Sequence, residues 1–270
     1  MASEAPFLGR GCREAAGVVV ASGRLQDFFI QHQRIAVAFS GGVDSSYLLY
    51  AATTAGCDVR AYYIKSQFQP QFELDDAARL TESLGAKITV AALDVLSNQS
   101  IAQNPPDRCY HCKSAIFTKI WELARADGFS VLCDGTNADD DASDRAGMRA
   151  LKEMGVTSPL QEAGLTKSAI RSLSQQAGLF THDKPSYACL ATHIPAGTAI
   201  TEQLLAKIER AENALFEMGF ADFRVRILPP CNARVQMPGS QWDKAAACRK
   251  EILSALQPDF NAVLLDLDVR

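Results

Sequence analysis

The sequence predicts an α/β fold: a doubly wound, mostly parallel sheet followed by a small α+β C-terminal domain. Three observations lead to this fold class. Apolar strands alternate with helical patterns over most of the chain, a glycine turn joins one strand to a helix, and the pattern becomes irregular near residue 184. We therefore expect a larger domain at residues 1–183 and a smaller one at 184–270.

The elements of the larger domain follow from runs and spacing of apolar residues. The run at 35–39 is apolar and partly β-branched, which is typical of a strand buried on both faces of a parallel sheet. Thr166 is a suitable N-cap for the last helix. Strands are expected at 35–39, 59–64, 87–91 and 131–134, and helices at 24–32, 45–55, 72–84, 114–126 and 166–178.

The smaller domain is expected to contain short strands packed with two helices. The patterns predict a helix at 201–218, strands at 223–228 and 233–237, a helix at 241–256 and a final strand at 262–269. No internal repeat interrupts this order.

Composition narrows the class of protein. The 270 residues are 47% hydrophobic, enough for a large core, and their formal net charge of −4 provides no attraction to a nucleic acid. No apolar run approaches the ~20 residues of a membrane span. Eight cysteines are too sparse for a secreted disulfide framework. A cytoplasmic protein without a membrane partner is expected.

The turn after the strand at 35–39 predicts a polyphosphate site. Its small residues let backbone N–H groups converge on one anion, and the following helix directs the positive end of its dipole to the same place. Neither a Walker loop nor a Gly-x-Gly-x-x-Gly fingerprint is present, which argues against γ-phosphate transfer and dinucleotide binding. A solvent-facing turn is the alternative. The candidate residues are Ser40, Gly41, Gly42, Asp44, Ser45 and Ser46.

The end of the fourth strand brings small and polar residues to the same edge of the sheet. Asp134, Gly135 and Asn137 lie where ligands bind in such sheets. Carboxylates at 139–141 can hold Mg²⁺ against phosphates, because that ion takes few carboxylates plus phosphate oxygens. A solvated Asp-rich turn is the alternative for them.

Three cysteines form a second chemical group. Cys109 and Cys112 stand at i and i+3 just before a predicted helix, a position that favours thiolates and a spacing that suits one metal centre. Cys189 lies in the irregular stretch at 183–195, called the boundary loop below. With this third cysteine, the count suits an iron–sulfur cluster with one open iron better than zinc. Two unrelated small residues are the alternative for the pair. The remaining cysteines, expected to be packed or incidental thiols, are Cys12, Cys57, Cys133, Cys231 and Cys248.

Two arginines lie on one predicted strand of the smaller domain. Arg224 and Arg226 are two residues apart, so both guanidinium groups leave the same face. Arginine suits bidentate phosphate binding, and a solvated edge strand is the alternative.

Five stretches carry a resemblance to known proteins. The sequence SGGVDS at 40–45 resembles the pyrophosphate loop of N-type ATP pyrophosphatases, which cleave ATP to AMP and pyrophosphate while adenylating a substrate oxygen. The others are DRCYHCK at 107–113, DGTN at 134–137, KPSYACLA at 184–191 and FRVR at 223–226. They resemble the LarE family, the ATP-dependent sulfur transferases of nickel-pincer nucleotide cofactor biosynthesis, over most of the chain.

The resemblance implies a reaction. ATP with Mg²⁺ would bind the larger domain, at the turn and at Asp134, Gly135 and Asn137, and adenylate a carboxylate of pyridinium-3,5-biscarboxylic acid mononucleotide. The smaller domain would bind that substrate and transfer sulfur. Cys189 matches the family's sulfur-bearing cysteine, which in some members gives up its own sulfur. In others the sulfur comes through a [4Fe-4S] cluster held by three cysteines, and Cys109 and Cys112 match the extra pair.

The resemblance also implies roles in the smaller domain. Arg224 and Arg226 match substrate-phosphate arginines, and Glu212 matches an acidic metal-contacting position, for which a surface carboxylate is the alternative. Gln236 stands where many members have glutamate, which puts a metal site shared with Glu212 in doubt.

Rival functions and partners are also implied. A tRNA thiolase shares the loop and the three cysteines, but its expected basic surface disagrees with the acidic net charge. A nucleotide-sensing module without turnover and an amide-forming relative are further alternatives. The expected partners are a small-molecule nucleotide substrate, sulfide or a sulfur-donor protein, and further copies of the chain in a homo-oligomer.

Overall fold

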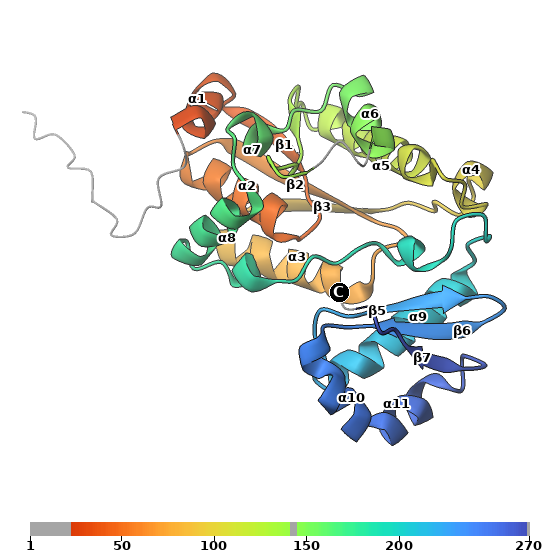
Figure 1. The fold of residues 1–270 in the computed structure, drawn as a ribbon. Helices are drawn as coiled ribbons and strands as arrows, with labels where there is room; N and C mark the ends of the chain where they lie inside the picture. Colours follow the sequence, from red (N-terminus) through yellow and green to blue (C-terminus); the bar gives the residue numbers. More distant parts are fainter. Residues whose placement is uncertain (1–22, 141–144, 269–270) are drawn as a thin grey trace, which may run out of the picture.

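A computed structural model describes residues 23–140 and 145–268, which contain two sheets with their own sets of helices (Figure 1). The larger sheet is parallel throughout, in the order β3-β2-β1-β4. Its strands are β1 (Arg34–Ala38), β2 (Asp58–Lys65), β3 (Lys87–Ala92) and β4 (Leu132–Cys133). The predicted fold class is confirmed. Within the described residues, no helix is long and apolar enough to cross a bilayer.

Side chains of β1 alternate between two helical layers, as the pleat of a strand requires. Ile35 and Val37 belong to the core beneath one set of helices. Ala36 belongs to the core on the opposite face, under α5 (Arg108–Ala126). The helices of the first layer are α1 (Gly23–Gln31), α2 (Val43–Thr54), α3 (Gln71–Leu84) and α8 (Lys167–Gln176). Both faces of the sheet are therefore covered, which explains the continuous apolar runs.

The predicted helix at 114–126 was wrong at its start. Helix α5 begins at Arg108, so Cys109 and Cys112 lie in its first turn and not before it. The backbone N–H of Arg108 already donates to the Pro105 carbonyl at 3.0 Å, so the chain turns helical directly after the two prolines. Short helices that the periodicity did not reveal are α4 (Gln99–Ala102) and α7 (Pro159–Glu162), together with α6 (Arg145–Glu153). The four residues of α4 and of α7 are too few for a period of 3.6 to be read.

The smaller sheet has the order β5-β6-β7, with β5 (Arg224–Leu228) antiparallel to β6 (Asn232–Gln236) and β6 parallel to β7 (Val263–Leu265). Helices α10 (Trp242–Ala247) and α11 (Arg249–Leu256) replace the single helix predicted at 241–256, because the backbone of Cys248 (φ −89°, ψ 16°) interrupts it. The last strand is shorter than predicted, since the Asp266 carboxylate accepts the Asp268 N–H and turns the chain. Val269 lies outside the described residues, as do Cys12 and the rest of the N-terminal tail.

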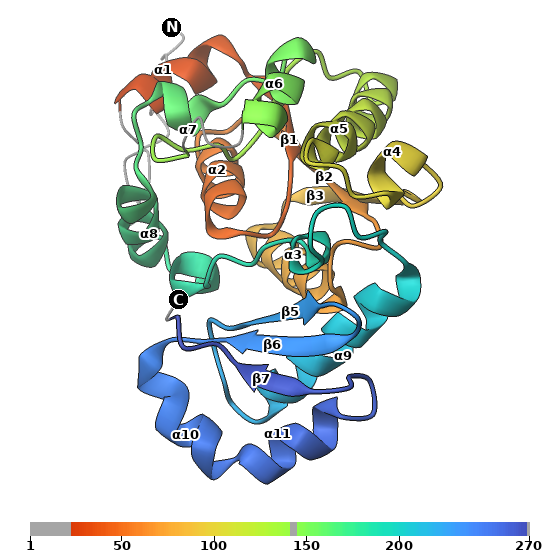
Figure 2. The ribbon, with the colours of Figure 1, turned by 45° about the vertical axis from the view of Figure 1, so that its right-hand side comes forward.

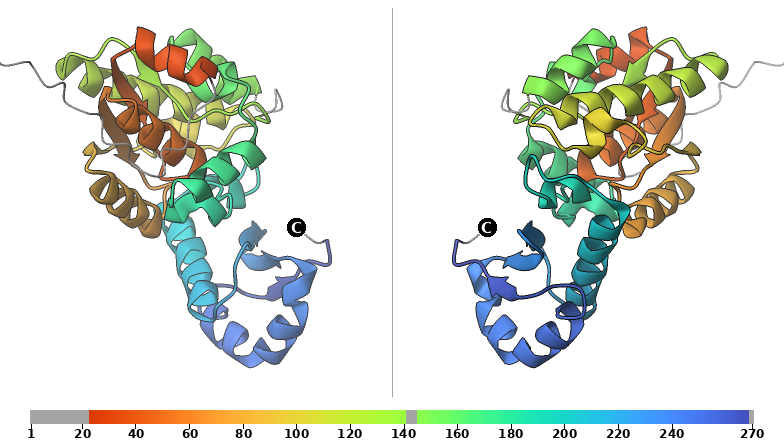
Figure 3. Two further views of the ribbon diagram at one scale, coloured as in Figure 1. Left: turned by 90° about the vertical axis from the view of Figure 1, so that its left-hand side faces the viewer. Right: turned by 90° about the vertical axis from the view of Figure 1, so that its right-hand side faces the viewer.

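Helix α9 (Glu202–Glu217) links the two units and begins at the N-cap Thr201, whose side chain accepts the Leu204 N–H. Figure 2 shows α10 and α11 on the side of the small sheet that faces away from the larger unit, and Figure 3 shows α9 running between the units. One apolar core joins Phe68 and Ile101 of the larger unit to Ile208 and Val225 of the smaller. The predicted division at residue 183 remains a prediction, but this shared core opposes independent motion.

Candidate functional site

A cavity of about 370 Å³ opens beyond the carboxyl ends of β1 and β2. The glycine turn lies at one part of its lining, through Ser40, Gly42 and Asp44, and Cys189 lies at another. The glycine turn and a thiol therefore share one cavity, although residues 44 and 189 are far apart in the chain.

The glycine turn is shaped by its backbone and held by its serines. Gly41 has φ +73°, and a Cβ there would come within 3.2 Å of the Glu73 carbonyl, so a side chain would be both strained and crowded. The Ser45 hydroxyl donates to the Gly42 carbonyl at 3.2 Å and accepts the Ser40 N–H at 3.3 Å. Gly42 offers α2 no side-chain cap, which leaves the first N–H groups of this helix for an anion.

The predicted residues after β4 support the turn from behind and do not line the cavity. Asp134 is buried and accepts hydrogen bonds from the hydroxyls of Thr136 and Ser158, and burial raises its pKa. The Asn137 amide donates to the Asp44 carboxylate at 3.4 Å. Gly135 lies against the backbone of Ser45. Three residues of the turn itself, Gly41, Ser45 and Ser46, do not line the cavity either.

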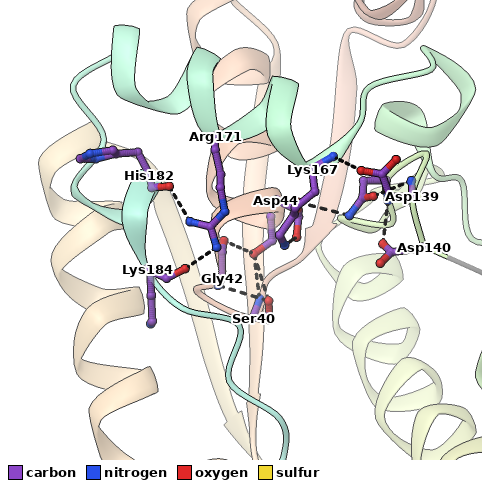
Figure 4. Close-up of polar contacts among 11 residues, drawn as sticks. Ser40, Gly42, Asp44, Asp139, Asp140, Lys167, Arg171, His182 and Lys184 are labelled. Carbon is purple, nitrogen blue, oxygen red and sulfur yellow. Dashed lines mark hydrogen bonds and ion pairs between the residues drawn. The ribbon is translucent and has the colours of Figure 1, made fainter. Parts of the chain in front are cut away.

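Two lysines that the sequence analysis missed reach the turn from other elements (Figure 4). Lys167, the first residue of α8, forms an ion pair with Asp44. Lys184 donates to the Gly41 carbonyl at 3.3 Å and pairs with Asp76 at 2.8 Å. Arg171 holds the Lys184 backbone by donating to its carbonyl at 2.7 Å. Both lysines line the cavity, so cations face the place where phosphates would lie.

The two described carboxylates of the acidic turn after Asn137 accept backbone N–H groups, one from α8 and one from the turn itself. Asp139 accepts the Lys167 N–H at 2.7 Å, and Asp140 accepts the Asn137 N–H at 2.9 Å, so neither is simply solvated (Figure 4). Asp141 lies outside the described residues. In the described ranges no group of three or more His, Cys, Asp or Glu side chains is arranged to hold a metal ion.

The three predicted cysteines lie around one buried guanidinium. Arg108 is 6% exposed, and its nitrogens lie 3.8 Å from Cys189 Sγ and 3.5 Å from Cys109 Sγ. Burial acts to lower the pKa of Arg108, but the neighbouring thiols raise it above its ordinary value. Burial raises the pKa of Cys112 to about 12, so the helix start does not make this thiol a thiolate as expected.

The predicted phosphate arginines lie on β5, at the edge of the site. Arg224 is buried, donates to the carbonyls of Phe223 and Ser186, and stacks 5.0 Å from the centre of the Tyr187 ring. Arg226 donates to Gln236 Oε1, and to the Thr192 carbonyl at 2.9 Å. Neither lines the cavity directly, although Ser186 and Tyr187 do.

Glu212 is buried, so the alternative that it is a surface carboxylate is wrong. The residue is 1% exposed, and its Oε1 accepts the Val225 N–H at 2.8 Å and lies 3.1 Å from His193 Nδ1. Its Oε2 accepts the Tyr187 hydroxyl. Both oxygens thus have partners within the protein, which does not fit a metal ligand. Gln236 instead bridges Arg226 and Asp266.

Glu73 is a cavity residue that the sequence analysis did not identify. It lies in the first turn of α3, where an acid is favourable at any helix start, so its position gave no signal. Burial raises the pKa of Glu73 to about 7. The positive charge of Lys184 acts to lower this pKa, and the negative charge of Asp76 acts to raise it further. Lys167 did carry a signal, because a cation at the first position of a helix opposes the dipole.

Comparisons with known proteins agree with this geometry. The family described as tRNA methyl transferase HUP domain matches residues 33–135. The pyridinium-3,5-bisthiocarboxylic acid mononucleotide synthase of Lactiplantibacillus plantarum is 34% identical over 238 residues, 87% of this chain and 86% of that protein. An uncharacterized protein of Synechocystis is 35% identical over 80% of this chain and 81% of its own length. The tRNA-specific 2-thiouridylase MnmA of Thermotoga is 24% identical over 44% of this chain and 40% of its own.

Proposed function

The chain belongs to the LarE-type family of pyridinium-3,5-bisthiocarboxylic acid mononucleotide synthases, and on this premise we propose that it is an ATP-dependent sulfur transferase acting on pyridinium-3,5-biscarboxylic acid mononucleotide. ATP binds with its phosphates on the turn at 40–46, between Lys167 and Lys184. A substrate carboxylate oxygen attacks the α-phosphorus, the α–β anhydride bond breaks, and pyrophosphate leaves. The acyl adenylate that forms is an activated electrophile.

Sulfur transfer then uses Cys189. Its thiolate attacks the acyl carbon, the bond to AMP breaks with its electron pair, and a thioester joins substrate and enzyme. Loss of the Cys189 Cα proton to a base breaks the Cβ–S bond, and the bonding electrons leave on sulfur. The products are a thiocarboxylate and dehydroalanine at position 189, with one AMP and one pyrophosphate per sulfur.

One observation carries this proposal: the glycine turn at 40–46 and Cys189 of the boundary loop line the same cavity. A thiol beside an adenylation site can intercept the adenylate before water does. Arg108 supports the reaction by donating to Cys189 Sγ at 3.8 Å, a contact that holds the sulfur in place at the cavity.

The test is incubation with ATP, Mg²⁺ and the biscarboxylate mononucleotide, followed by mass spectrometry of small molecules and of the intact protein. We expect AMP, pyrophosphate, a thiocarboxylate and a protein mass lower by one H₂S. Cys189→Ser should still exchange labelled pyrophosphate into ATP but should form no thiocarboxylate. Absence of both exchange and AMP in the wild type would contradict the proposal.

A [4Fe-4S] cluster at Cys109, Cys112 and Cys189 remains a prediction. The three thiols share Arg108 but are not arranged around a metal centre, so no step above is routed through a cluster. Iron and acid-labile sulfide analysis after anaerobic purification tests it. Mg²⁺ accompanies ATP in the proposal. The homo-oligomer, the cytoplasmic location and an external sulfur donor also remain predictions; sedimentation, cell fractionation and turnover with added sulfide test them.

A further inference from the structure

The wall of the cavity carries a carboxylate that the reaction above does not use. Glu73 of α3 lines the cavity together with Tyr63 of β2 and Tyr187 of the boundary loop. No hydrogen bond or ion pair to the Glu73 carboxylate is found within 23–140 and 145–268. Asp76, one turn further along the same helix, is by contrast paired with Lys184 at 2.8 Å. A largely enclosed carboxylate without a partner costs free energy, so a cation from a ligand would stabilise it.

The charges around Glu73 leave it poised between its two protonation states. Burial raises its pKa to about 7, and Asp76 on the same helix adds to this. Three cations from other elements act in the opposite direction: Lys184 of the boundary loop, Lys65 of β2 and Arg224 of β5. A further positive charge arriving in the cavity would therefore favour the ionised carboxylate.

The neighbouring aromatic side chains suit a flat cation. The Arg224 guanidinium lies 5.0 Å from the centre of the Tyr187 ring, and the rings of Tyr187 and Phe72 make a T-shaped contact with 5.0 Å between their centres. Tyr63 is 1% exposed, and its hydroxyl has no hydrogen-bond partner among the described residues. Aromatic faces attract cations, and a carboxylate beside them adds the counter-charge.

The geometry points to Glu73, flanked by Tyr63 and Tyr187, as the group that binds the pyridinium cation of the substrate and selects a charged ring over a neutral one. This inference rests on the proposed function. A pyridinium mononucleotide carries its positive charge on the ring and negative charges on phosphate and carboxylates. An acidic wall close to Lys184 and Arg224 therefore complements both signs of charge in one ligand.

Nicotinamide mononucleotide and its reduced form are matched probes, because they share the phosphate and differ in the charge of the ring. By calorimetry, the wild type should bind the oxidised form about tenfold more tightly than the reduced form. Glu73→Gln keeps the shape and removes the charge, so it should weaken binding of the oxidised form about tenfold and leave the reduced form unchanged. Glu82→Gln, an exposed change on the same helix, is the control and should behave as the wild type.

Two results would overturn the inference: equal binding of both probes by the wild type, or unchanged discrimination in folded Glu73→Gln. In the second case, an accompanying loss of Mg²⁺·ATP affinity would make Glu73 a magnesium ligand. Failure of the proposed function gives a different pattern, in which the wild type discriminates ring charge through Glu73 but forms no thiocarboxylate.

Discussion

Gly135 lies so close to Ser45 that a Cβ added to it would be 2.8 Å from the Ser45 nitrogen and 3.1 Å from its Cα. The end of β4 is thereby packed directly on the first turn of α2. Because the opposing atoms are backbone, they can yield only if the phosphate turn itself moves.

Gly135→Ala should therefore weaken ATP binding and the fold together. We expect a loss of about 1–3 kcal/mol in the free energy of unfolding, as for other overpacked sites. Urea titration and ATP calorimetry measure the two effects. Gly23→Ala is the control, since nothing lies within 4 Å of its added Cβ. Wild-type stability and ATP affinity in Gly135→Ala would show that the contact is not rigid.

Lys167→Met should raise the KM for ATP about tenfold or more, because it removes a cation beside the phosphate turn. The ion pair with Asp44 holds the Lys167 ammonium group beside the turn, so this cation is already in position when ATP binds. Pyrophosphate exchange at varied ATP gives KM and kcat separately. Lys119→Met, which breaks only an i,i+3 pair with Glu122 on α5, serves as control. An unchanged KM for ATP would remove Lys167 from the binding site.

Arg108→Gln should slow alkylation of Cys189 by iodoacetamide at pH 8, because it removes the guanidinium that contacts the sulfur. Arg108→Lys should retain part of the rate. Cys112 should stay unmodified in each folded protein, since burial raises its pKa to about 12. Peptide mass spectrometry assigns the modified thiol, and Arg125→Gln on the same helix is the control. Equal rates in Arg108→Gln and wild type would contradict this role.

Glu73→Gln should stabilise the protein at alkaline pH. The pKa of Glu73 rises from 4.5 to about 7 on folding, so the folded state holds a proton that the unfolded chain releases between these values. The free energy of unfolding of the wild type therefore falls as the pH rises from 4.5 to about 7. Glutamine at position 73 does not titrate, so the variant avoids this loss. We expect the free energy of unfolding of the variant to exceed that of the wild type by about 3 kcal/mol at pH 8 and by little at pH 4. Parallel pH profiles from urea unfolding would contradict the raised pKa.

Glu212→Gln tests whether this carboxylate is structural. Its oxygens bond Val225 and Tyr187 and contact His193, so the change should lower the free energy of unfolding by about 1–3 kcal/mol even with chelator present. Glu217→Gln, at the exposed end of α9, should have little effect. A loss of stability seen only when a divalent metal is available would instead support the metal-contacting role.

Several features could be predicted from the sequence because they depend on neighbours in the chain. The strand at β1, the glycine turn and the N-cap Thr166 are local patterns of apolar residues and small polar ones, and the structure has each of them. The start of α5 was missed because the proline pair gave no signal that the helix begins immediately. The cysteine pair was therefore placed outside the helix that carries it.

By itself the sequence determined the parallel sheet and the glycine turn between β1 and α2, and it predicted a phosphate site there and a sulfur role for three cysteines. Tertiary structure alone decided that Arg108 contacts Cys189, that Lys167 meets Asp44, and that Glu212 is buried. The reason is physical: these contacts join residues distant in the chain, and burial, which sets the pKa of Glu73 and Cys112, depends on how whole elements pack.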